Sequence, residues 1–320
     1  MDAGFESATI AGEPSPRRVL QFPAVSRPLV LGLYGLLVLI WSSTWVAISI
    51  GVDDIPPLYS AGLRFTLAGA GLLVLCRVLR RPLRSDGPLV ALLAVLPFAT
   101  AYGLIYWAEQ YIPSGLTAVL FGVLPIYTAG LVLLFLREEP VHPRFFGGVG
   151  IAVGGLVLAF GESVSLGTSE RAGLAAAAVL VSPLASSIGT IGQKRRAAGL
   201  DPFALNGWSM LAGGLVLLAV SGLGESWGDA RWTGEAVASM LYLAVFGSAV
   251  TFVVLTILLR ELPAVTISYL PLVLPFGALL FGWALEGEPL TLPAIGGALL
   301  VAAGLAVAQR RPKVRSEVAA

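Results

Sequence analysis

Residues 139–159 read EPVHPRFFGGVGIAVGGLVLA, and residues 288–308 read EPLTLPAIGGALLVAAGLAVA. Seven positions are identical at a constant offset of 149 residues, among them the Glu-Pro pair and three glycines of each stretch. Upstream positions match at an offset of 150, which pairs Pro113 with Pro263, Leu124 with Leu274 and Pro125 with Pro275. The chain therefore contains two copies of one unit, and a single-residue insertion reconciles the two offsets.

The composition places both copies in a membrane. Apolar residues make up 57% of the 320 residues and charged residues only 12%, against roughly 25% charged residues in an ordinary soluble domain. A bilayer core about 30 Å thick needs about 20 apolar residues per helix. The chain supplies ten such stretches, at 29–51, 57–79, 89–111, 113–136, 145–161, 172–193, 203–223, 236–259, 263–285 and 292–309. We therefore predict an all-α integral membrane protein with ten transmembrane helices.

Each copy holds five of these spans. Because five is an odd number, the second copy enters the membrane from the opposite face, which makes two inverted five-helix repeats (5+5), an arrangement that recurs in secondary transporters. The predicted organisation is a disordered cytoplasmic tail over 1–28, a first repeat over 29–161, an external linker over 162–171, a second repeat over 172–309 and a basic cytoplasmic tail over 310–320.

The basic residues predict the orientation. Seventeen of the 20 Lys and Arg residues fall in the two tails and the even-numbered loops, while the opposite side has only Arg171 and Arg231. Cytoplasmic loops of membrane proteins are enriched in Lys and Arg, so both termini are expected in the cytoplasm. Arg outnumbers Lys 18 to 2, which is typical of a GC-rich bacterial genome, and the expected location is a bacterial inner (plasma) membrane.

These features resemble the EamA-type family of the drug/metabolite transporter superfamily. The shared pattern is two five-helix repeats that each end in Glu-Pro and a Gly-Gly helix, with Trp41-Ser42-Ser43 in the first span and Arg64 in the second, after Pro56-Pro57. The resemblance covers about residues 30–308. It implies a ten-helix secondary transporter, often an exporter of amino acids or related metabolites, with a central cavity between the repeats. It does not imply a particular substrate.

Polar and aromatic residues deep in the spans are candidates to line such a substrate cavity. They are Trp41, Ser42, Ser43, Tyr102, Tyr106, Ser182, Ser186, Thr251 and Tyr269. A serine hydroxyl can instead bond a carbonyl one turn back in its own helix, and a tyrosine near a helix end can lie at the membrane interface. A structural role therefore stays open for each of them.

Two prolines and one ion pair are candidates for hinges and gates. Pro125 and Pro275 lie near the middle of their spans, and each removes an amide donor, so they either hinge a gate or merely bend a helix. Arg64 is the one basic residue clearly inside a span, where an uncompensated guanidinium is costly. Glu109, near the external end of the third span, is its best partner by depth. We expect an Arg64 to Glu109 ion pair, structural or gating, rather than direct substrate contact.

The remaining residues bear on coupling and on other functions. No Asp or Glu lies at the centre of a span and the only histidine, His142, is in a loop, which favours a facilitator or an exchanger over a buried carboxylate relay. There is no His-Glu-x-x-His motif, and the serines have no histidine within a span to activate them. An enzyme, a metal site and a cofactor are therefore not expected. Nucleic acid is not an expected partner, because the basic loops are short.

The expected partners are a small-molecule substrate and the lipid bilayer. The spacing of Gly150 and Gly154 predicts close helix packing, within the fold or in a homodimer. Two alternatives to a metabolite exporter stay open: a multidrug or small-amphiphile exporter of the same fold and, in a different class, a membrane channel or scaffold without carrier activity.

Overall fold

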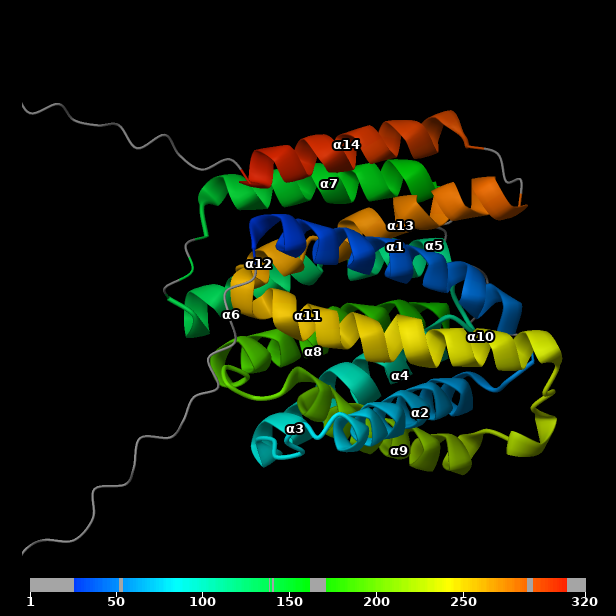
Figure 1. Cartoon of the computed structure of the whole chain (residues 1–320). Coiled ribbons are helices and arrows are strands. Elements are labelled where there is room, and N and C mark those ends of the chain that lie inside the picture. The colour runs from blue at the N-terminus through cyan, green and yellow to red at the C-terminus, as the bar shows by residue number, and fades with distance from the viewer. Residues whose placement is uncertain are drawn as a thin grey trace, which may run out of the picture.

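The structure, a computed structural model, describes residues 26–51, 54–137, 139, 141–161, 171–286 and 290–309. Within these residues the chain folds into helices, and ten spans are long and apolar enough to cross a membrane (Figure 1). Six of them are single helices, the first five being α1 (Arg27–Gly51), α2 (Pro57–Val78), α7 (Pro143–Phe160), α8 (Ala172–Arg196) and α9 (Pro202–Gly224). The tenth span, α14 (Leu292–Gln309), is also a single helix. The prediction of ten helices in two sets of five is confirmed. The predicted tails, apart from 26–28, and the linker residues 162–170 lie outside the described residues.

The third and eighth spans each contain a π-helical segment at an equivalent place. They consist of α3 (Gly87–Leu93), η1 (Ala94–Ala101) and α4 (Tyr102–Ala108), and of α10 (Gly234–Ala244), η4 (Val245–Val250) and α11 (Thr251–Glu261). The two π-helical segments are related by the same offset of about 150 residues that relates the two repeats. Such segments are rare and are frequently found at functional sites.

The fourth and ninth spans are broken into two helices. They consist of α5 (Ser114–Phe121) and α6 (Leu124–Phe135), and of α12 (Ala264–Ile267) and α13 (Leu270–Phe281), which continues as the π-helical η5 (Gly282–Glu286). Pro125 stands in the first turn of α6, where a proline removes no helical hydrogen bond, so it begins a helix and does not bend one. Pro275 lies inside α13. The position equivalent to Phe121 is Pro271, in the first turn of α13, and this second proline places the break about one turn earlier in the second repeat.

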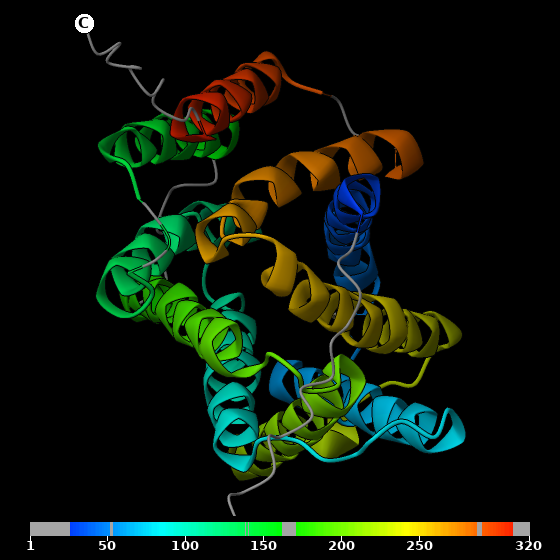
Figure 2. The same ribbon diagram turned by 60° about the vertical axis from the view of Figure 1, so that its left-hand side comes forward.

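Two helix pairs at opposite edges of the molecule join equivalent elements of the two repeats. α7 packs on α14 and α2 packs on α9, as both views show (Figures 1 and 2). Each contact is lined by glycines: a Cβ on Gly214 would collide with the backbone of Thr66 and Gly62, and a Cβ on Gly304 would collide with that of Gly148. Gly150 and Gly154, predicted to pack closely, have nothing within 4 Å of the position of an added Cβ. The packing glycines of α7 are therefore Gly148 and Gly155.

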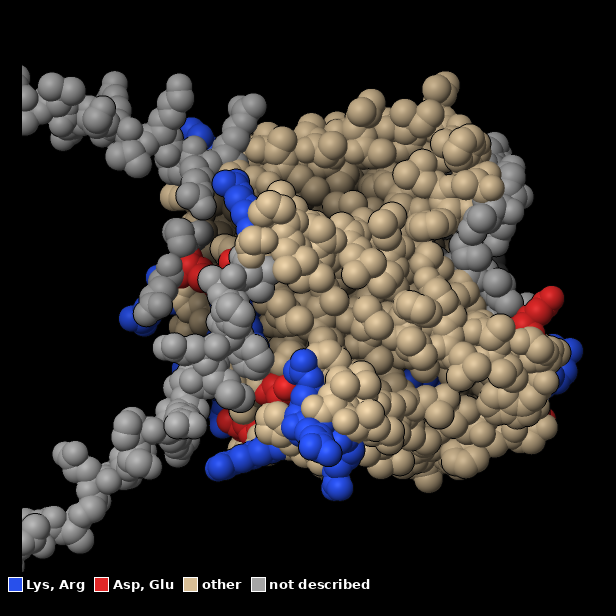
Figure 3. Space-filling model, in the orientation of Figure 1, with Lys and Arg blue, Asp and Glu red and all other residues tan. Residues whose placement is uncertain are grey.

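Charged side chains gather at the two ends of the helical bundle, and the face drawn in Figure 3 shows little charge between them. The end at which α1 begins and α14 ends is called the termini side below, and the other end is called the far side. A belt with little charge between two charged ends is the surface that a bilayer requires.

Candidate functional site

A cavity of about 230 Å³ lies between the repeats. Helices from both halves of the chain line it, including α1, α2, α4 and α5 from the first repeat and α8, α11, α12 and α13 from the second. It extends from Glu109 and Thr117, near the far side, to Gln193 and Ser268, near the termini side. The lining is mainly apolar and aromatic with a few polar groups, as is usual for a small-molecule site.

Arg64, in the middle of α2, is the positive charge of this cavity. Its side chain is 98% buried, and its Nε donates to Ser248 Oγ at 2.7 Å. Nη2 donates to the Gly247 carbonyl at 2.9 Å, and Nη1 donates to the Tyr106 hydroxyl at 3.2 Å. Gly247 and Ser248 belong to the π-helical η4, so this segment presents the acceptors that hold the guanidinium. All three partners are neutral, and no anion among the described residues pairs with the guanidinium.

Glu109, the residue that follows α4, is the acidic residue of the cavity lining. The predicted Arg64 to Glu109 ion pair is not formed, because the described ion pairs include neither residue and the Arg64 donors are taken by η4 and Tyr106. The Glu109 Oε1 atom is buried and has no hydrogen-bond partner among the described residues. Arg64 and Glu109 therefore line one cavity without pairing with each other.

Aromatic rings cover one wall of the cavity. The Trp41 and Phe252 ring centroids lie 5.5 Å apart, and those of Phe98 and Phe252 lie 4.9 Å apart. Tyr102 is the repeat counterpart of Phe252, and their centroids lie 6.2 Å apart. The Arg64 guanidinium lies 5.5 Å from the Tyr102 ring centroid, within cation–π range. Both repeats thus contribute an aromatic residue at the same position of the third and eighth spans.

The structure brings together about half of the residues predicted to form the site. Those that line the cavity are Trp41, Tyr102, Tyr106 and Ser186 among the cavity candidates, with Arg64, Glu109 and Pro275 among the hinge and gate candidates. Metal ligation is not indicated, since no group of three or more His, Cys, Asp or Glu residues is suitably placed in the described part of the chain.

The other predicted residues lie outside the cavity lining, and three of them join helices to one another. Ser42 donates to the Leu274 carbonyl at 3.2 Å, Ser43 meets the Tyr242 hydroxyl at 2.6 Å, and Ser182 donates to the Ala101 carbonyl at 3.0 Å. Thr251 bonds the Ser248 carbonyl within its own span. The Tyr269 ring is buried 6.0 Å from the Phe145 ring, and Pro125 is buried at the start of α6.

A buried polar network near the termini side was missed in the sequence. Gln193 lines the cavity, and its Oε1 lies 2.9 Å from the Thr256 hydroxyl. That hydroxyl in turn accepts from Asn206 Nδ2 at 2.8 Å. Asn206 could have indicated this network in the sequence, because it lies inside a predicted apolar span, where a polar amide needs a hydrogen-bond partner.

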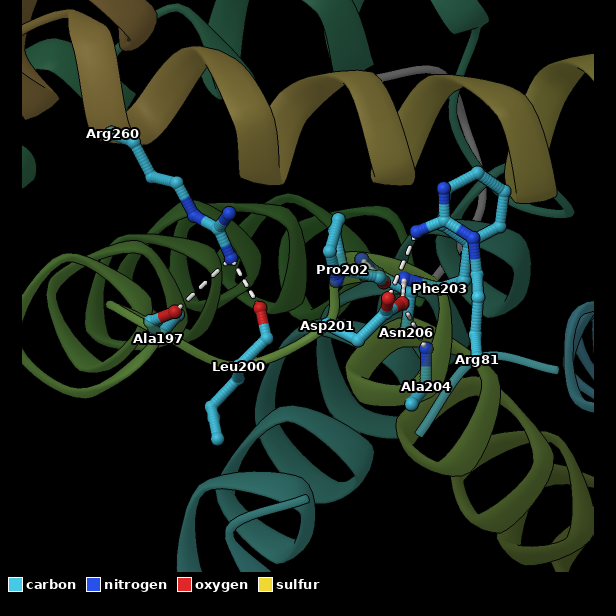
Figure 4. A network of polar contacts seen from close by, with 9 residues as sticks. All are labelled: Arg81, Ala197, Leu200, Asp201, Pro202, Phe203, Ala204, Asn206 and Arg260. Atoms are coloured by element: carbon cyan, nitrogen blue, oxygen red, sulfur yellow. Dashed lines mark hydrogen bonds and ion pairs between the residues drawn. The ribbon is translucent and has the colours of Figure 1, made fainter. Parts of the chain in front are cut away.

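Capped helix ends hold the termini side of the cavity together. Lys194 Nζ, at the end of α8, donates to the carbonyls of Leu259 and Leu262 at 2.8 and 2.7 Å, at the end of α11. Arg260 of α11 donates in return to the carbonyls of Ala197 and Leu200 beyond α8, as Figure 4 shows. Each helix thus supplies a cation to the C-terminal carbonyls of the other, where positive charge is favourable.

Glu139 adds an anion to this group. Its Oε1 lies 3.3 Å from Lys194 Nζ, and its Oε2 accepts from the Ala264 amide at 2.8 Å, at the start of α12. Lys194, Glu139 and Arg260, which we call the terminal clamp, therefore link α8, α11, α12 and the segment after α6.

Comparison with known proteins agrees with this architecture. The EamA-like transporter family matches the chain over residues 30–161 and 173–309, which are the two repeats. The uncharacterized transporter YoaV of Bacillus subtilis (strain 168) is 30% identical over 272 residues, covering 83% of this chain and 92% of YoaV. The uncharacterized inner membrane transporter YedA of Escherichia coli (strain K12) is 32% identical over 270 residues, covering 82% of this chain and 85% of YedA.

One solved crystal structure shares the fold, with a TM-score of 0.76 over 89% of this chain and 97% of that chain, at 18% sequence identity. The resemblance found in the sequence is confirmed. The chain belongs to the EamA-like transporter family, and it is a membrane transporter and not an enzyme.

Proposed function

We propose that the chain is a secondary transporter that exports small metabolites, amino acids or related compounds, by alternating access around the cavity between its repeats. The observation that carries this proposal is the cavity itself: both repeats line it, and it holds the charge of Arg64 inside the membrane. Charged groups at membrane depth are expensive and mark substrate pathways.

The size of the cavity favours a small metabolite over a drug. Its volume of about 230 Å³ lies below the roughly 300–1,000 Å³ of pockets for drug-sized ligands. The apolar and aromatic wall around Trp41 and Phe252, with only a few polar groups, suits a small molecule with one apolar and one charged part. A multidrug exporter is therefore the less favoured function.

The broken and π-helical spans support movement around this cavity. Inverted-repeat transporters place their substrate at the repeat interface, beside discontinuous helices, and move one part of the fold against the other. Here the breaks after Phe121 and Ile267 and the π-helical η1 lie at the cavity, and the π-helical η4 holds the cavity residue Arg64. Export is the direction that the family resemblance implies.

The proposed location is a bacterial inner membrane. The relative YedA bears the name of an inner membrane transporter, and the seventeen basic residues of the tails and even-numbered loops favour cytoplasmic termini. Gly150 and Gly154 of α7 face away from the rest of the described chain.

The test is counterflow in proteoliposomes. Proteoliposomes that contain the purified protein are loaded with one unlabelled compound from a panel of neutral amino acids and related metabolites. Uptake of the same compound, labelled and added outside, is then measured. Saturable counterflow of one compound, lost in Trp41→Ala and in Tyr102→Ala but retained in Trp283→Ala, supports the proposal, because Trp283 is exposed on the outer face. Leak down any gradient, without counterflow, would instead indicate a channel.

A further inference from the structure

A groove lies on the outer surface of the bundle, over the termini-side end of α8. Both α3 and α6 pack against α8, and the groove, of about 560 Å³, runs between them. Five apolar side chains and one glycine form its walls and floor: Leu92, Leu131, Phe135, Ile188, Ile191 and Gly192. All three helices belong to membrane spans, and Leu184, one turn earlier on α8, is 38% exposed. The α8 groove therefore opens toward lipid.

Two arginines, the last residues of α8, close the termini-side end of the α8 groove. Arg196 is paired, because its Nη2 lies 2.8 Å from the Asp86 Oδ2 atom. Arg195 has no ion pair or hydrogen bond among the described residues. Its guanidinium lies 6.0 Å from the centroid of the Phe135 ring, which lines the groove. This positive charge therefore stands at the end of an apolar groove without an anion.

The neighbouring charges are engaged elsewhere. Lys194 turns to the other side of α8, where its Nζ donates to the Leu259 carbonyl at 2.8 Å within the terminal clamp. The Asp86 carboxylate accepts from Arg196 and, at 3.0 Å, from the Leu89 amide. The described part of the chain thus holds Lys194 and Asp86 in contacts of their own and supplies no anion to Arg195.

The order of groups along the α8 groove fits a phospholipid. From Ile188 to Arg195 the floor is apolar over about 10 Å at the helical rise, and it ends at a cation where the span ends. A guanidinium binds phosphate oxygens through two parallel hydrogen bonds, and basic pockets between transmembrane helices bind anionic lipid headgroups. A zwitterionic headgroup would bring its own ammonium toward Arg195 and Arg196, so an anionic headgroup is favoured.

We propose that the α8 groove binds one anionic phospholipid of the leaflet at the termini side, with an acyl chain between α3 and α6 and the phosphate on Arg195. The groove shares no residue with the cavity between the repeats, so this inference does not depend on the transport function. The lipid would contact α3 and α6 of the first repeat and α8 of the second, and it should therefore stabilise the folded protein.

The test is thermal unfolding of delipidated protein in a neutral detergent, titrated with phosphatidylglycerol or with phosphatidylcholine of the same acyl chains. A ligand that binds only the folded protein raises its melting temperature as the ligand concentration rises. Phosphatidylglycerol should do so saturably, and phosphatidylcholine should need about a tenfold higher mole fraction, the effect of one hydrogen bond to a charged group. An equal effect of the two lipids would overturn the inference. So would an equal effect of glycerol 3-phosphate, because the ligand would then be a free phosphate that leaves the groove empty.

Two variants test the site itself. Arg195→Gln removes the cation and Ile188→Trp fills the groove, and each should shift the phosphatidylglycerol titration to about a tenfold higher mole fraction. Arg144→Gln, exposed in the first turn of α7, and Val181→Trp, exposed on α8 outside the groove, are the matched controls and should keep the wild-type titration. If phosphatidylglycerol stabilises Arg195→Gln and both controls equally, the lipid coats the whole protein without occupying the groove, and the inference is wrong.

Discussion

Arg64 connects the second span to the π-helical segment of the eighth. A lysine at this position would keep the charge but would lack the planar fork that reaches Ser248, Gly247 and Tyr106 together. We expect Arg64→Lys to raise KM for a transported compound by about tenfold, the loss of one or two hydrogen bonds to a charged group. Counterflow kinetics measure this effect, with Arg77→Lys, on the exposed end of α2, as the control. Unchanged kinetics in Arg64→Lys would show that the fork is not used.

At the scale of single residues, the sequence predicted the depth of a side chain in the membrane better than the direction in which it points from its helix. Tyr102 and Tyr106 were placed at membrane depth and do line the cavity, whereas Ser182 and Thr251 lie equally deep but point to neighbouring backbone carbonyls. The direction of a side chain around its helix depends on how the ten helices pack. No pattern within one span carries that information, especially where all faces are apolar.

The helix elements show where local sequence rules were insufficient. The ten spans follow from length and apolar composition alone, but η1 and η4 have no strong local signal beyond a mid-span Pro97 and a Gly247-Ser248 pair. Hydrogen bonds made by other helices, from Arg64 and Trp41 to the Gly247 carbonyl, accompany the π-helical geometry. A tertiary contact of this kind is invisible to a pattern read within one helix.

The contact between α2 and α9 depends on glycine at defined positions. A Cβ on Gly69 would lie against the backbone of Leu211 and Gly207, which has no side-chain freedom to yield, while Gly71 of the same helix has nothing within 4 Å. Gly69→Ala should therefore destabilise the protein by about 1–3 kcal/mol, and Gly71→Ala should be neutral or stabilise it by up to about 1 kcal/mol. Thermal unfolding in detergent compares the two variants. Equal melting temperatures of the two variants would show that α2 and α9 can move apart to admit a methyl group without loss of stability.

The terminal clamp links the ends of four elements through three side chains. Lys194→Met removes the donor shared by Leu259, Leu262 and Glu139, so the termini side should open more often. In a Cys76→Ser background, Thr190→Cys reports on this opening, because Thr190 lines the cavity. Labelling by a membrane-impermeant maleimide in nanodiscs should become about tenfold faster with Lys194→Met, as expected when one or two charged hydrogen bonds are lost.

Arg195→Met is the matched control for the clamp, because Arg195 is the next residue of α8 and is exposed over the Phe135 ring. Its labelling rate should equal that of the parent. If both variants behave alike, the clamp has no part in closing the cavity, and the ion pair with Glu139 is an ordinary surface contact.

For the whole molecule, the sequence predicted the architecture because inverted duplication leaves marks in the chain itself. Glu139 and the glycines of α7 recur at a fixed offset, and five spans per copy require inversion.

The distribution of Lys and Arg residues also predicts the orientation of the chain in the membrane. With Cys76→Ser, a cysteine at the exposed Ser226 should be labelled by an impermeant maleimide in intact cells, and one at the exposed Arg84 only after the membrane is broken. The reverse pattern would place the termini outside.

Alternating access makes a prediction about both ends of the cavity at once. Ile105 lines the cavity near the far side, on the turn of α4 before Glu109, and Thr190 lines it toward the termini side. In a carrier only one end is open at a time, so a change that exposes one residue must protect the other.

We therefore compare Ile105→Cys and Thr190→Cys, each in the Cys76→Ser background, with and without a transported amino acid and with and without Lys194→Met. Lys194→Met should speed labelling of Thr190→Cys and slow that of Ile105→Cys. The two open states are in one equilibrium, so a rise in the population of one lowers the population of the other. A transported amino acid should shift the two rates in opposite directions as well. If both rates rise together, the cavity is open from end to end, and the protein conducts as a channel.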